Sequence, residues 1–156
     1  MLGKMLTAAK ELTTSTSPID LLKKLHQKHQ ERDIIIGTES AINLNPYRHL
    51  GKDAIFTHNH PKNGSFSIQD METAVDFNMA EMRAVTPNGK IYIMKRGTEG
   101  LKVDGKHMEF VYQFVQTELK ADLTFNNLYK AGMIDKAMDI YFQRIAERIG
   151  GIYNRY

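Results

Sequence analysis

The chain has 156 residues, of which 42% are hydrophobic and 25% are charged, and its net charge is +3. This balance is typical of a soluble globular protein and excludes a disordered or fibrous chain. Because the sequence contains no cysteine, disulfides, thiolate zinc sites and thiol nucleophiles are excluded, and any metal must bind to His, Asp or Glu. Lys and Arg never form a run longer than two residues, so the positive charge is only weak evidence for a nucleic-acid partner.

Residues 1–16 are predicted to form a short amphipathic helix followed by a linker. Apolar residues recur at helical spacing from Met1 to Leu12, and the polar run 13–17 ends this pattern. The same residues lack the continuous apolar run of a signal peptide or a membrane span. We therefore expect a cytoplasmic location and no membrane partner.

Residues 17–100 are predicted to form an α+β core. An N-cap serine followed by proline predicts a helix over about 18–31. The β-branched run at 33–36 and a similar run at 54–57 are short, apolar and bounded by polar or glycine residues, which predicts two buried strands.

The second half of this core is predicted to contain one helix and a β-hairpin. The helix covers 67–80, begins with Ser67 as its N-cap and has an apolar stripe along one side. Segments 82–86 and 90–95 flank the sequence Pro-Asn-Gly at 87–89. Because this glycine tolerates a positive φ, the three residues predict the turn of a hairpin.

Residues 101–156 are predicted to be a helical C-terminal extension. Apolar stripes at helical spacing cover 108–119 and 134–149, and a glycine pair ends the second stripe. The expected fold class is therefore α+β: a small mixed or antiparallel sheet of about four strands, with packed helices and this helical extension.

The segment between the second strand and the following helix carries the residues with the clearest chemistry. His58 and His60 stand one residue apart at the end of a strand, so their side chains point to the same side. Asp70 lies on the first turn of the next helix, and a glycine-containing loop can return its carboxylate to the strand end. Two histidines and one carboxylate can bind a metal and leave a position open for water. Zinc in such a set lowers the pKa of bound water to ~7, which produces a hydroxide nucleophile.

This motif resembles the JAB/JAMM metalloprotease-like fold, especially its RadC-like branch and related domains of phage proteins. The resemblance covers about residues 33–96, and six residues separate the second histidine from the serine, one fewer than is usual in that family. It implies that the two histidines and the aspartate bind Zn²⁺, that the serine helps to stabilise the oxyanion, and that an upstream glutamate acts on the metal-bound water. The family pattern H-x-H-P, a small Gly/Ser loop and S-x-x-D is matched in order by His58, His60, Pro61, Ser67 and Asp70.

For the upstream glutamate our choice is Glu39, which follows the strand at 33–36. Glu31 ends the helix predicted before that strand, and Glu11 lies in the predicted terminal helix, so neither is expected on a preceding strand. Without a general base, the same site would bind a metal or another ligand but hydrolyse slowly.

The same residues also fit purely structural roles, without any metal. The pattern S-x-x-D formed by Ser67 and Asp70 is the signature of an N-terminal helix cap, and the two histidines fit a polar turn that leaves a strand. The combination of strand, H-x-H-P, loop and S-x-x-D favours a metal or catalytic site. Tyr47 and Arg48, in the loop between the two strands, could bind an anionic substrate group if they lie close to this site.

Three functions are compatible with these observations. The first is a metal-dependent hydrolase that cleaves an amide or isopeptide bond in an unknown protein or peptide substrate. The second is a non-enzymatic binding or inhibitory module, for example a phage-encoded one, that kept the fold and lost the base. The third is a metal-dependent nuclease or nucleotide hydrolase, because nothing in the sequence excludes a nucleic-acid substrate.

Overall fold

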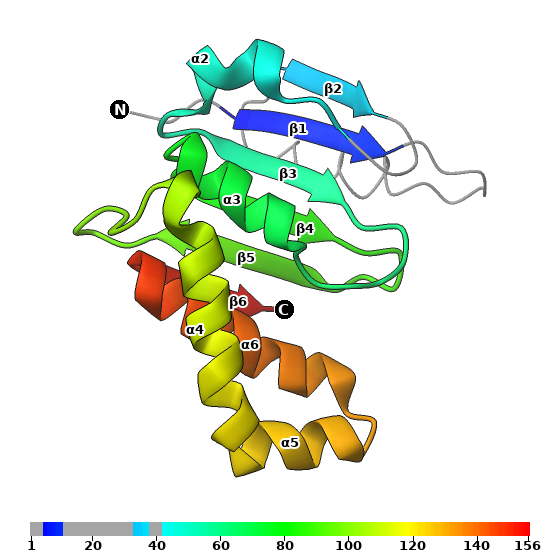
Figure 1. Cartoon of the computed structure of the whole chain (residues 1–156). Helices are drawn as coiled ribbons and strands as arrows, with labels where there is room; N and C mark the ends of the chain where they lie inside the picture. Colours follow the sequence, from blue (N-terminus) through cyan, green and yellow to red (C-terminus); the bar gives the residue numbers. More distant parts are fainter. Residues whose placement is uncertain (1–4, 11–32, 38–41) are drawn as a thin grey trace.

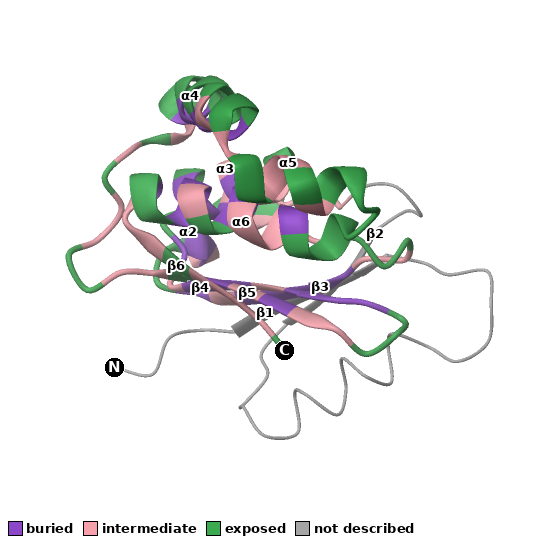
Figure 2. Ribbon diagram, turned by 90° about the horizontal axis from the view of Figure 1, so that it is seen from below, coloured by how far each residue is buried: buried purple, intermediate pink, exposed green. Residues whose placement is uncertain are grey.

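The computed structural model describes residues 5–10, 33–37 and 42–156 of the chain. In this part the backbone forms one mixed β-sheet with helices stacked on one of its faces (Figures 1 and 2). The first four strands across the sheet are parallel, whereas the fifth is antiparallel to both of its neighbours. In spatial order the strands are β2 (Asp33–Gly37), β1 (Met5–Lys10), β3 (Ile55–Asn59), β4 (Glu81–Val85), β5 (Ile91–Arg96) and β6 (Gly151–Arg155).

One helix connects two neighbouring parallel strands of this sheet. α3 (Ile68–Asp76) is the crossover helix between the parallel strands β3 and β4, as such a connection requires. The other helical elements are η1 (Asn45–Tyr47), α2 (Arg48–Gly51), η2 (Gly105–His107), α4 (Met108–Ala121), α5 (Leu123–Lys130) and α6 (Ile134–Ile149).

Within the part of the chain that the structure describes, none of the helices is both long and apolar enough to cross a membrane.

The α+β class expected from the sequence is confirmed. All four expected strands are present, as β2, β3, β4 and β5, and the residues between the last two form the expected tight turn, with Gly89 at a φ of 84°. The expected helix over 67–80 is present but ends at Asp76. The helix predicted over 18–31 and the residue Glu39 lie outside the described residues.

The prediction of an N-terminal helix is wrong for residues 5–10, which form the strand β1. β1 lies between β2 and β3 and is parallel to both, with Ala8 opposite His58. The sequence here is a run of five residues, Met-Leu-Thr-Ala-Ala, before a lysine. A run this short satisfies either periodicity, and pairing with two neighbouring strands decides in favour of the strand.

The end of the chain adds a second strand to those expected, because the extension ends in β6 and not in a helix. Gly150, at a φ of 78°, ends α6 and turns the backbone so that β6 can pair with β5. Residues 101–156 therefore share the sheet with the preceding core.

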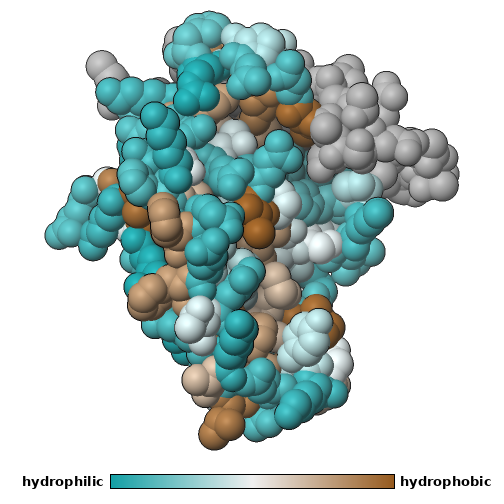
Figure 3. All heavy atoms as spheres, in the orientation of Figure 1, coloured by the Kyte–Doolittle hydropathy of each residue, from teal (hydrophilic) through white to brown (hydrophobic). Residues whose placement is uncertain are grey.

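On the outer surface, apolar side chains interrupt a mostly hydrophilic face over the α4 and α5 region (Figure 3).

The strand register aligns the core beneath the helices. Residues directly opposite each other in a sheet point to the same face, so two rows of side chains cross β3, β4, β5 and β6 on the face that carries the helices. Their apolar members belong to the main hydrophobic core or, for Tyr153, pack against it. One row contains Phe56, Met82, Met94 and Tyr153, and the other contains His58, Ala84, Tyr92 and Arg155.

We expect Gly150→Ala to destabilise the protein more than Gly132→Ala does. Both glycines have positive φ, 78° and 71°, and this backbone alone costs an alanine about 1 kcal/mol. A Cβ on Gly150 would also lie 2.7 Å from the carbonyl oxygen of Gly100, whereas a Cβ on Gly132 would meet no atom within 4 Å. The free energy of unfolding in urea should therefore fall by roughly 1–3 kcal/mol more for Gly150→Ala. Equal losses would contradict this account of the α6–β6 junction.

Candidate metal centre

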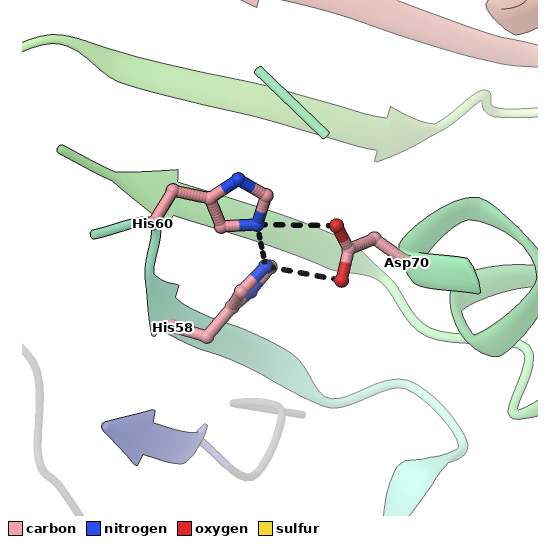
Figure 4. Close-up of side chains that lie close together, drawn as sticks. All are labelled: His58, His60 and Asp70. Atoms are coloured by element: carbon pink, nitrogen blue, oxygen red, sulfur yellow. Dashed lines mark hydrogen bonds and ion pairs between the residues drawn. The ribbon is translucent and has the colours of Figure 1, made fainter. Parts of the chain in front are cut away.

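Two histidines meet at the carboxyl end of β3. His58 is the fourth residue of the strand, and the backbone N–H of His60 donates to the carbonyl of Val85 at 2.7 Å, which continues the pairing with β4. Both imidazoles therefore point to the same side, and their Nε2 atoms lie 2.8 Å apart (Figure 4). The side chain of His58 is only 1% exposed and that of His60 is 11% exposed.

Asp70 faces both histidines from the first turn of α3 (Figure 4). Its Oδ1 lies 3.2 Å from Nε2 of His58, and its Oδ2 lies 3.2 Å from Nε2 of His60. Each of the three residues offers one ligand atom, and these atoms all lie within 4.8 Å of one another. The structure thus brings the three proposed ligands together, as the sequence predicts.

The capping interpretation of Ser67 and Asp70 is confirmed. The Ser67 backbone N–H and hydroxyl donate to Oδ2 of Asp70 at 2.6 and 2.8 Å, and the Asp70 N–H donates to Oγ of Ser67 at 3.2 Å. One carboxylate therefore caps α3 and faces the histidines at the same time. The Ser67 hydroxyl is engaged by Asp70, so it could donate to a substrate oxyanion only by leaving that carboxylate.

The ionised state of Asp70 suits a metal ligand. Burial acts to raise the pKa of Asp70, but the charge of His58 and the hydrogen bonds from both histidines outweigh it and hold this pKa well below its usual range. Asp70 is therefore ionised at neutral pH, which metal binding requires.

The distances between the candidate ligand atoms can be compared with those of a zinc site. Ligand atoms 2.0–2.1 Å from a tetrahedral zinc lie about 3.3 Å apart. Each imidazole nitrogen lies 3.2 Å from a different oxygen of Asp70, which is close to this value, whereas the two nitrogens, 2.8 Å apart, are closer together than in such a site.

His58 and Asp70 open onto a cavity of about 550 Å³. The cavity lies between the 42–48 segment and α3, and its volume is in the range of small-molecule sites. Arg48, one of the two candidates for binding an anionic group, lines it, whereas Tyr47 does not. The Arg48 guanidinium already lies 3.7 Å from the carboxylate of Asp76, so an anionic substrate group would compete with that residue.

The structure does not bring a glutamate to the group of ligands among the described residues. Glu39 lies outside those residues. The reason for passing over Glu11, its place in a predicted helix, no longer holds, because Glu11 directly follows the strand β1 in the sequence. β1 is parallel to β3, with Ala8 opposite His58, so it ends at the same edge of the sheet as the histidines. In the sequence, the signal for a strand just before Glu11 was the short apolar run that precedes Lys10.

Comparisons of the chain with models of protein families, with curated proteins and with solved structures find no match.

We expect Asp70→Asn to separate the capping and metal-binding roles of this residue. An amide oxygen can still accept a hydrogen bond from the Ser67 N–H, so the weakened cap should lower the free energy of unfolding of the metal-free protein by at most ~1 kcal/mol. A neutral amide is a poor zinc ligand, so zinc content after dialysis should fall to near zero. Zinc content by mass spectrometry and urea denaturation measure the two effects. If the variant kept as much zinc as the parent protein, Asp70 would be a cap and nothing more.

Proposed function

We propose that this chain is a metal-dependent hydrolase that resembles the JAB/JAMM peptidases, in which His58, His60 and Asp70 hold a Zn²⁺ ion. The observation that carries the proposal is the convergence of two imidazole nitrogens and one carboxylate, from a strand end and a helix start, at separations of 2.8 and 3.2 Å. Such a set of three protein ligands leaves one position open, as catalytic zinc sites do.

The residues of the site are suited to hold a cation in one geometry. The His58 imidazole stacks on the ring of Phe56, with their centroids 5.3 Å apart, and this contact restricts its rotation. The capping hydrogen bonds from Ser67 orient the carboxylate of Asp70, a role that supporting partners of metal ligands commonly have. When bound here, Zn²⁺ would polarise a substrate carbonyl and lower the pKa of a coordinated water.

The cavity beside the site supports an amide or isopeptide bond in a protein or peptide as the substrate. Its lining combines the partly buried apolar side chains of Ile42 and Leu44 with the exposed amides of Asn43 and Asn45. A peptide segment needs both kinds of contact, because its backbone must keep hydrogen-bond partners while its side chains bury apolar surface.

A binding module without hydrolysis is the second candidate, and one observation favours it. The group of potential ligands in the described ranges contains two histidines and an aspartate but no glutamate. Hydrolysis at useful rates requires a general base within hydrogen-bond reach of the attacking water. If neither Glu11 nor Glu39 supplies that base, the site would bind zinc without turnover.

The first test is the zinc content of the purified chain. We expect about one zinc per chain in the parent protein and almost none in His58→Ala or His60→Ala, because two remaining ligands bind zinc weakly. His107→Ala is the matched control. Its imidazole also contacts an aspartate, Asp104, at 2.6 Å, but on the exposed segment η2. A parent protein that binds no zinc after incubation with zinc salt would refute the proposal.

The second test separates the two candidate functions. We expect either Glu11→Gln or Glu39→Gln to keep the zinc of the parent protein and to lower peptidase activity at least ~100-fold, the usual contribution of a general base. Activity is measured as cleavage of a mixed peptide library by the zinc-loaded chain, detected by mass spectrometry. If the zinc-loaded parent cleaves no peptide, or if both variants remain fully active, the hydrolase with Glu11 or Glu39 as its base is wrong.

A further inference from the structure

The loop that joins the two halves of the metal site is attached to the C-terminal elements of the fold. Residues 61–66 connect His60 to the cap of α3, so the path of this loop decides where Asp70 stands relative to the histidines. Lys62, Asn63 and Gly64 are exposed, whereas Phe66, the last residue of the loop, is only 5% exposed. Phe66 is therefore the buried residue through which the loop is anchored in the core.

Phe66 lies among aromatic rings from four other parts of the chain. Its ring centroid is 6.4 Å from those of His58, Tyr92 and Tyr153 and 6.0 Å from that of Phe142. The strand register sets His58 and Tyr92 on either side of Ala84, in one row. The ring of Phe66 thus contacts a metal ligand on one side and residues of β5, α6 and β6 on the other.

A second attachment is polar. The Tyr153 hydroxyl donates to Oδ1 of Asp139 at 2.9 Å and lies 3.5 Å from Oγ of Ser65, from which it can accept. Asp139 is in turn held by Arg155, whose guanidinium lies 2.8 Å from its Oδ2. Burial raises the pKa of Tyr153, so the phenol stays protonated and keeps its role as a donor.

We propose that Phe66 and Tyr153 are positioning residues of the metal site, through which α6 and β6 set the geometry of His58 and Asp70. Neither residue belongs to the set of ligands. The inference rests on the proposed function, because it concerns the same metal. It assigns to the C-terminal helices and strand a role in metal affinity, beyond their role in the core.

The test compares zinc affinity with stability in two variants of the full chain. Tyr153→Phe removes only the hydroxyl, and Phe66→Leu removes the ring while keeping an apolar side chain. Tyr141→Phe is the control, because it also removes only a hydroxyl, from a buried residue of α6 that lines a different cavity. Zinc affinity is measured by competition with a chelating dye, and Co²⁺ absorption spectra report the geometry of the ligands.

We expect zinc affinity to fall about 10-fold in Tyr153→Phe and up to ~100-fold in Phe66→Leu, with a changed Co²⁺ spectrum, as is typical for partners of metal ligands. Tyr141→Phe should keep the affinity and spectrum of the parent even if its melting temperature falls. If Phe66→Leu does not fold, Tyr153→Phe decides alone. Affinities and spectra equal to the parent would overturn this inference and leave the proposed function intact. A parent chain that binds no metal would overturn both.

Discussion

The carboxylate of Asp70 is the constraint on which the rest of the site depends. It accepts the hydrogen bonds that start α3, and it faces two imidazoles at 3.2 Å. The position of the helix start and the geometry of the potential ligands therefore cannot change independently. A helix cap is typically worth ~1 kcal/mol, but here the same interactions also orient a candidate metal ligand, so stability and the proposed function are coupled in one side chain.

Burying these polar groups together is costly unless their charges compensate one another. Isolated buried charges are strongly unfavourable, and His58 is 1% exposed. The carboxylate supplies one compensation, because it lies against both Nε2 atoms. Those two nitrogens are 2.8 Å apart, so only one of them can direct a proton toward the other, and two positively charged imidazoles would repel each other. A cation bound by neutral imidazoles and a carboxylate resolves this conflict, which supports metal binding as the function of the cluster.

Three neighbouring parts of the fold support this cluster: β4, α4 and the turn between β4 and β5. β4 continues its pairing past the end of β3 to His60, and α4 contacts the start of α3 through the Tyr112 hydroxyl, which donates to the carbonyl of Ile68 at 2.8 Å. The loop in between is held to the β4–β5 turn by the Asn88 N–H, which donates to Oδ1 of Asn63 at 3.1 Å. Rigid support of this kind limits the entropy lost when a ligand binds.

The sequence by itself determined the elements whose signals are local. The cap of α3, the hairpin turn at 87–89 and the shared direction of His58 and His60 follow from residue types at adjacent positions, and the structure contains all three. The period-two geometry of a strand and the short loop to the helix were enough to place the three candidate ligands together.

Only the tertiary structure decided the features that depend on partners far away in the sequence. β1 is a strand because β2 and β3 pair with it, although its four apolar residues also fit a helix. β6 exists because the turn at Gly150 brings it to β5. The role of Phe66 could not be read from a polar loop, since the rings that surround it come from three later elements, β5, α6 and β6, as well as from β3. Local signals specify a residue's own conformation, whereas packing partners are chosen by the whole fold.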